Sequence, residues 1–166
     1  MMGDEKQPGP GGLTHVDARG DARMVDVGAK EITRRTATAA GVAKLGPDAL
    51  AAVLERRAAK GDVLQIAQLA GIQGAKRTSD WIPLCHPLPL DAVSVTLEVD
   101  PATSEVRCEA TVRATWRTGV EMEALCAVSA ALLTVYDMLK AVDRGIVLGP
   151  IVLVHKEGGK SGTWHR

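Results

Sequence analysis

Apolar and polar residues alternate over long stretches of this chain, and the alternation predicts β-strands. Residues 93–99 place valine or leucine at every second position, Asp100-Pro101 turns the chain, and Val106–Trp116 repeats the rhythm. A period of two is typical of strands with one buried face, so these residues are expected to form a hairpin. Three further segments are expected to be strands: Met24–Lys30, Ile32–Val42 and Ile146–His155.

Three segments carry the signals of helices. The first begins at Gly46-Pro47-Asp48, continues through ALAAVLERRAAK and is stopped by Gly61. The second is expected from Asp62 to about Gly71, and the third from about Glu123 to Val142. Helical blocks among paired strands predict an α+β fold, a ferredoxin-like antiparallel sheet with the helices packed on one face.

The stretch Lys76–Leu90, which reads KRTSDWIPLCHPLPL, fits neither pattern. It holds three of the eight prolines of the chain, placed around Cys85 and His86. Proline fixes φ, lacks an N–H donor and pushes the residue before it toward an extended conformation. The segment is therefore expected to be a stiff irregular loop that no regular element can hold, and such loops commonly form the walls of binding or catalytic sites.

Composition and charge narrow the class of protein. The 166 residues, 46% of them apolar, fit a single domain over residues 21–166, preceded by a Gly/Pro-rich tail over 1–20 that is expected to be disordered. The basic and acidic residues balance at 20 each and only four aromatic residues occur, which disfavours nucleic-acid binding.

Membrane insertion and disulfide bonding are also disfavoured. Ala124–Tyr136 is an uncharged run of thirteen residues and no uncharged run is longer, whereas a bilayer crossing needs about 20 residues. Three cysteines without the spacing of a metal site or a disulfide framework indicate a reducing compartment. We therefore expect a cytoplasmic protein with no membrane partner.

Charged residues near the predicted element ends are the first candidates for chemistry. Lys60 comes directly before Gly61, which is expected to stop the first helix. The alternative to a chemical role for Lys60 is that of an ordinary cation at a helix C-terminus. Glu121 and Glu123 flank Met122; their carboxylates would point the same way in a strand and diverge by about 200° in a helix. The alternative for this pair is two acids that suit the dipole of a helix start.

Asp137 and Lys140 share a face of the predicted C-terminal helix. Such a pair usually contributes only about 0.2–0.5 kcal/mol at a solvated surface. The helix before it, ALCAVSAALLTVY, carries no charge and is expected to be buried on most faces. We therefore expect partial desolvation of both residues, which lowers the pKa of a lysine and permits acid/base chemistry near neutral pH.

Two further motifs suit anions or protons. The C-terminal KEGGKSG run from Lys156 to Gly162 has glycines and lysines for a phosphate, and a mobile loop from about residue 156 that closes over one is expected; a tail without a role stays open. It is not a Walker A motif, since the first glycine is missing and no helix follows. His86 is expected to bind phosphate or carry protons, although a structural histidine is the alternative. Cys85 suits neither zinc nor nucleophilic chemistry without further partners.

Five separated segments together resemble the MoaC family of molybdenum cofactor biosynthesis. They read MVDVGAKEITRR, KGDVLQIAQLAGIQGAKRTSDWIPLCHPLPL, TGVEMEAL, VYDMLKAV and GPIVLVHKEGGKSG, and the resemblance covers roughly residues 13 to 162. It implies a phosphorus-oxygen lyase that converts 3′,8-cyclo-7,8-dihydroguanosine 5′-triphosphate to cyclic pyranopterin monophosphate and diphosphate. It also implies that the radical enzyme MoaA supplies this substrate, and that the chain forms a hexamer of three dimers with the pocket between subunits.

The resemblance assigns roles to the candidate residues. Lys60, Asp137 and Lys140 would be the acid/base group, and Glu121 and Glu123 would contact the purine-derived base. The other residues of the substrate-binding set, including the phosphate candidates, are His86, Cys85, Met122, Lys156, Arg35 and Lys76. No resident metal or cofactor is expected, and Mg²⁺ accompanying the triphosphate stays open. A purine-nucleotide-binding regulatory module and a silent paralogue are the competing functions, since ferredoxin-like folds host many activities.

Overall fold

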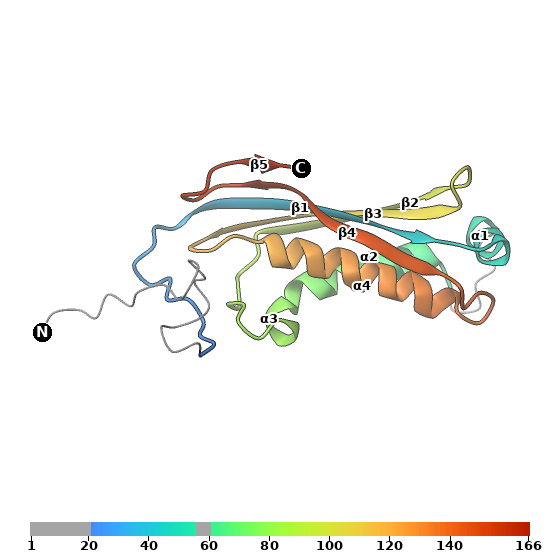
Figure 1. Cartoon of the computed structure of the whole chain (residues 1–166), viewed down its shortest axis with the longest axis horizontal. Helices are drawn as coiled ribbons and strands as arrows, with labels where there is room; N and C mark the ends of the chain where they lie inside the picture. Colours follow the sequence, from blue (N-terminus) through green and yellow to red (C-terminus); the bar gives the residue numbers. More distant parts are fainter. Residues whose placement is uncertain (1–20, 56–60) are drawn as a thin grey trace, which may run out of the picture.

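The computed structural model describes residues 21–55 and 61–166, and its centre is an antiparallel sheet (Figure 1). The strands follow the spatial order β2-β3-β1-β4-β5. Their bounds are β1 Thr33–Lys44, β2 Ala92–Asp100, β3 Glu105–Trp116, β4 Val147–Glu157 and β5 Trp164–His165. The helices are α1 Pro47–Leu54, α2 Val63–Lys76, α3 Thr78–Trp81 and α4 Glu121–Leu139.

The predicted fold class is confirmed. The chain runs β1, α2, β2, β3, α4, β4, and these four strands pair in the order β2-β3-β1-β4, which is the ferredoxin-like arrangement. The two long helices lie together on one face of the sheet (Figure 1). The predicted hairpin is also correct, since β2 and β3 pair from Ala92 opposite Arg113 to Asp100 opposite Glu105.

Alanine dominates the sheet face beneath the helices. Ala37, Ala39 and Ala43 of β1 and Ala110 and Ala114 of β3 are all fully buried. Their small side chains let α4 pack close to the sheet, and its buried face interdigitates with them. One α4 window is long and apolar enough to cross a bilayer, but 61% of it is buried inside the protein, so its apolar character is that of a core helix.

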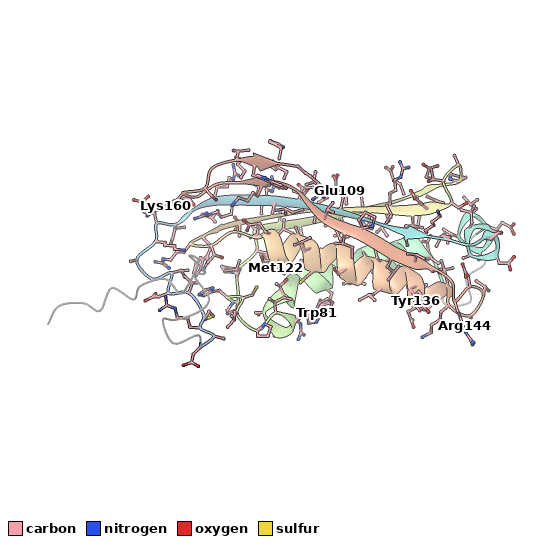
Figure 2. All side chains as sticks on the ribbon, in the orientation of Figure 1. Trp81, Glu109, Met122, Tyr136, Arg144 and Lys160 are labelled. Carbon is pink, nitrogen blue, oxygen red and sulfur yellow. The ribbon has the colours of Figure 1, made fainter. Side chains whose placement is uncertain are left out.

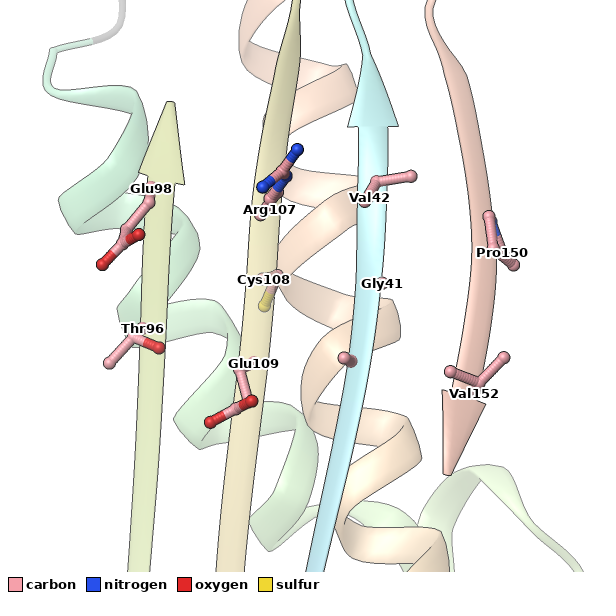
Figure 3. A pocket seen from close by; sticks show the side chains of 10 residues that line it. Gly41, Val42, Thr96, Glu98, Arg107, Cys108, Glu109, Pro150 and Val152 are labelled. Atoms are coloured by element: carbon pink, nitrogen blue, oxygen red, sulfur yellow. The ribbon is translucent and has the colours of Figure 1, made fainter. Parts of the chain in front are cut away.

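The face of the sheet opposite the helices carries a hollow of about 420 Å³ (Figure 3). Thr96 and Glu98 of β2, Arg107 and Glu109 of β3 and Val152 of β4 are among its lining residues. None of the residues that the sequence singled out for chemistry lies there.

Several predicted boundaries need correction. Met24–Lys30 is not a strand; a turn occupies residues 28–30, and the Gly28 N–H bonds to the Asp26 carboxylate. The first helix begins at Pro47 as expected but ends at Leu54, and the rest of its predicted length falls partly on residues 56–60, outside the described residues. The second helix continues past Gly71 to Lys76, because Gly71 and Gly74 pack against α4 instead of stopping it.

The expectation that Lys76–Leu90 holds no regular element is also wrong in its first part. Lys76 ends α2, and α3 occupies Thr78–Trp81. The Thr78 hydroxyl donates to the Ala75 carbonyl at 3.0 Å, which links the two helices. The prolines begin only at Pro83, and from there the chain is irregular as predicted.

The contact between α2 and α4 depends on a glycine. A Cβ at Gly74 would lie 2.6 Å from Ala130 Cβ and 2.9 Å from the Cys126 carbonyl oxygen, which is too close for either atom. The two helix backbones are therefore as close as this position allows.

We expect Gly74→Ala to destabilise the protein. Alanine favours a helix by about 1 kcal/mol over glycine, but overpacking a core contact typically costs about 1–3 kcal/mol, so the net loss should reach about 2 kcal/mol. Denaturant unfolding measures it. Gln73→Ala, on the exposed face of the same helix, is the matched control and should change stability by less than about 0.5 kcal/mol. A Gly74→Ala protein more stable than wild type would contradict the close contact.

Candidate active site at the start of α4

A hollow of about 260 Å³ lies at the N-terminal end of α4. Three segments that are distant in sequence line it, within residues 25–30, 84–88 and 118–123. Five residues of the predicted substrate-binding set are among them: Cys85, His86, Glu121, Met122 and Glu123. The fold therefore brings together the loop that holds Cys85-His86-Pro87, called the CHP loop, and the GVEME motif of residues 119–123. A shared binding site requires such an arrangement.

Glu121 is the first residue of α4, and its carboxylate faces the C-terminal end of β4. Its Oε1 lies 3.2 Å from Lys156 Nζ, with both side chains mostly buried. A Cβ at Gly119 would overlap the same carboxylate, so glycine leaves the space that Glu121 occupies. Lys156 Nζ also donates to Ser161 Oγ at 2.5 Å, which ties the GGKSG loop to the site.

Arg35 and Lys156 lie on the same side of the sheet. Lys156 pairs with Ala37, whose side chain is buried beneath the helices, and Arg35 is two residues before Ala37 on β1. Arg35 Nη2 donates to the Arg117 carbonyl at 3.5 Å, and its Nε is a buried donor without a partner among the described residues. A Cβ at Gly159 would overlap the Arg35 guanidinium, so the GGKSG loop packs directly on this arginine.

Glu123 is the most buried charged group of the site, with 4% of its surface exposed. Desolvation raises the pKa of its carboxyl group to about 7; a hydrogen bond from its own backbone N–H opposes the rise, and the charge of Glu121 adds to it. Glu123 can therefore hold or release a proton near neutral pH, and so can either donate a hydrogen bond or accept one. Because α4 begins at Glu121, the two carboxylates diverge.

The thiols near the site are not activated. Burial raises the pKa of Cys85, and the neighbouring charge of Glu123 raises it further. Burial also raises the pKa of Cys126. Since only the thiolate is a strong nucleophile, Cys85 lines the site as a neutral group. Among the described residues there is no cluster of three or more His, Cys, Asp or Glu side chains that could hold a metal ion.

Asp137 and Lys140 lie at the other end of α4. The helix rises about 1.5 Å per residue, which puts Asp137 about 20 Å from Glu123, and Figure 2 labels Met122 and Tyr136 toward the opposite ends of the helix. Asp137 Oδ1 and Lys140 Nζ are 2.7 Å apart, with 51% and 52% of their side chains exposed. The hydrogen bond and the charge of Asp137 raise the pKa of Lys140 above its ordinary value. The expectation of a desolvated lysine with a lowered pKa is therefore wrong for the single chain, because the helix end is solvated.

The remaining candidates are not gathered in this hollow. Lys76 is exposed at the end of α2 and does not line it. Lys60 lies outside the described residues. The predicted tail over residues 1–20 also lies outside the described residues. The predicted C-terminal loop is described: its residues 158–163 connect β4 to the short strand β5.

Sequence reasoning missed part of the pocket wall. Val25, Val27 and Lys30 line it from the segment that was expected to be a strand, and Thr118 and Gly119 line it before α4. The turn signals Asp26 and Gly28 could have shown that residues 24–30 form a loop. Nothing in a hydropathy pattern shows which loops meet.

We expect Glu123→Gln to change how stability depends on pH. A carboxyl group with a raised pKa binds its proton more tightly in the folded state, so the folded state loses stability as pH rises from the ordinary value of 4.5 toward about 7. That interval corresponds to about 3 kcal/mol, and the glutamine variant should lack this loss. Unfolding free energies measured between pH 4.5 and 8 test the difference. Parallel curves for the two proteins would show that Glu123 is not desolvated.

Comparison with known proteins shows the family of the chain. Residues 24–159 match the MoaC family. A protein of Rhodospirillum rubrum called cyclic pyranopterin monophosphate synthase is 59% identical over 153 residues, which cover 92% of each chain. Proteins of the same name from Cereibacter sphaeroides and Thermomicrobium roseum are 58% and 57% identical, covering 92% and 93% of this chain and 96% and 93% of their own. The family match covers most of the chain, including all three segments of the pocket wall, and these relatives are 57–59% identical over more than nine-tenths of it, so the chain belongs to the MoaC family.

Proposed function

We propose that this protein is a lyase that converts 3′,8-cyclo-7,8-dihydroguanosine 5′-triphosphate to cyclic pyranopterin monophosphate with release of diphosphate. One observation carries the proposal: the hollow at the start of α4 joins two carboxylates and a histidine, and Lys156 links it to the GGKSG loop. The relatives called cyclic pyranopterin monophosphate synthase, at 57–59% identity over more than nine-tenths of the chain, support it.

The charges of the site suit a substrate with a base at one end and phosphates at the other. Glu121 and Glu123 accept N–H donors of the purine-derived ring. Lys156, Arg35 and His86 bind the phosphates, where charge-assisted hydrogen bonds stabilise the leaving diphosphate as its bond to the substrate breaks. Without substrate, the ion pair with Glu121 holds Lys156 in position. A bound phosphate would then compete with Glu121 for this lysine.

The acid/base group of Lys60, Asp137 and Lys140 requires a second copy of the chain. Asp137 and Lys140 lie about 20 Å along α4 from the hollow, given the helix rise, and a rigid helix cannot bring its two ends together. A neighbouring copy that presents these residues to the hollow completes the site. A hexamer of three dimers supplies such neighbours. Burial there would desolvate Lys140 and so oppose the hydrogen bond and the charge of Asp137, which now raise its pKa.

The proposed function includes a supplier of the substrate, a companion ion and a cellular compartment. MoaA supplies the cyclised substrate, and Mg²⁺ enters, where it is needed, as the companion of the triphosphate. The free cysteines Cys85, Cys108 and Cys126 support a reducing, cytoplasmic location.

Turnover of the cyclised substrate tests the proposal directly. The wild-type protein should release diphosphate and form the pterin product together, both followed by chromatography. Lys140→Ala should lower kcat by at least about 100-fold, because a positioned proton-transfer group typically contributes 10²–10⁴-fold. Lys44→Ala removes an exposed lysine at the end of β1 and should leave kcat unchanged. Tight binding of the substrate by wild type without either product would indicate a regulatory module or a silent paralogue.

Lys156→Ala should instead weaken substrate binding. A charge-assisted hydrogen bond contributes about 1.5–3 kcal/mol, so the affinity for the substrate triphosphate should fall about 10-fold to 100-fold. Equilibrium binding to the catalytically inactive Lys140→Ala background measures this without turnover. Lys44→Ala in the same background is again the control. Unchanged affinity in the Lys156 variant would remove this lysine from the phosphate site.

A further inference from the structure

We propose that Asp143 is a positioning residue that fixes the last turn of α4 against the start of α1 and so orients Asp137 and Lys140 for the reaction. This inference rests on the proposed function. Asp143 follows α4 in the loop to β4, and it belongs to neither the pocket wall nor the acid/base group.

The Asp143 carboxylate joins two segments through backbone hydrogen bonds. Its Oδ2 accepts from the Gly46 N–H at 2.7 Å, across 97 residues of sequence. Its Oδ1 accepts from the Gly145 N–H, also at 2.7 Å. The backbone N–H of Asp143 donates to the Leu139 carbonyl at 3.0 Å, so the residue is bonded to the last turn of the helix as well. Bonds between ionised acceptors and N–H groups are short and about twice as strong as neutral ones.

Gly46 is shaped for this contact. It is the residue immediately before α1, and a Cβ there would lie 2.7 Å from Asp143 Oδ2, too close for any other residue without a shift. The carboxylate also lies at the positive end of the α1 dipole, where a negative charge is favourable. The paired hydrogen bonds, together with the close approach of Oδ2 to Gly46, thus place the carboxylate between α1 and the end of α4.

The bonded turn carries the proposed acid/base residues. Lys140 caps α4 through its N–H to the Tyr136 carbonyl at 2.8 Å, and Val142 donates to Leu139 at 2.9 Å. The Asp137 and Lys140 side chains are half exposed and paired with each other, and the backbone beneath them sets the place from which the pair extends. On its other side, Asp143 holds α1, and the chain continues from α1 toward Lys60. A shift of about 1 Å in reacting groups can cost about 100-fold in rate.

Asp143→Asn tests the role with little change of shape. The asparagine amide can accept from one backbone N–H only, and its NH₂ group would face the other. We expect kcat to fall about 10-fold to 100-fold with KM changed by less than about twofold, because the substrate-binding hollow lies at the far end of α4. Gly46→Ala disturbs the same contact from the α1 side and should lower kcat similarly. The double variant should be little worse than either single variant, since both remove one interaction.

Asp100→Asn is the matched control. Asp100 accepts from the Ala102 and Thr103 N–H groups at 3.0 and 3.4 Å in the β2–β3 turn. Its substitution should lower thermal stability without changing kcat. Loss of kcat in this control, or unchanged kcat in Asp143→Asn, would overturn the positioning role while wild-type turnover keeps the proposed function. Absence of product from wild type would overturn the proposed function, and the positioning role with it.

Discussion

The close packing of α4 on an alanine-lined sheet is the contact on which the rest of the structure depends. A Cβ at Gly41 would lie 2.9 Å from Val128 Cγ1 and 3.0 Å from Leu132 Cδ1, so β1 leaves no spare room beneath the helix. Gly74 lets α2 approach α4 closely where the two helices pack side by side on the same face of the sheet. A closely packed interior has low compressibility and resists displacement of its helices. The two ends of α4 consequently have fixed positions relative to the sheet.

That rigidity separates the chemistry of the chain into two places. The start of α4 meets the loop that holds Cys85 and His86 and the 25–30 segment around a partly enclosed hollow, and Glu121 there pairs with Lys156 at the end of β4. The end of α4 meets α1 through Asp143 and presents an ion pair to solvent. Under the proposed function, a single protomer would have a substrate-binding half and an acid/base half, and the proposed hexamer would join halves from different copies.

The sequence predicted the elements better than their contacts. Alternation at residues 93–99 and 106–116 correctly predicts the hairpin. A sheet with one buried face requires apolar side chains at every second position of its strands. The sequence predicts a helix end near Gly71, where α2 in fact continues, because a glycine that stops a helix and one that permits a helix crossing look alike until the partner helix is known. The pocket wall from Val25 to Lys30 was missed because its role comes from a tertiary contact with residues far along the chain.

The electrostatics of α4 reverse the expectation from its composition, and the reversal has a simple cause. The uncharged run from Ala124 to Tyr136 correctly indicates a buried helix, yet it carries no information about which end other segments cover. In the fold, Glu123 in the first turn is buried, so desolvation raises the pKa of its carboxyl group to about 7. Asp137 and Lys140 at the last turn are half exposed, and the hydrogen bond and charge of Asp137 raise the pKa of Lys140. One helix thus carries a carboxyl group able to exchange protons near neutral pH at its start and a charged lysine at its end.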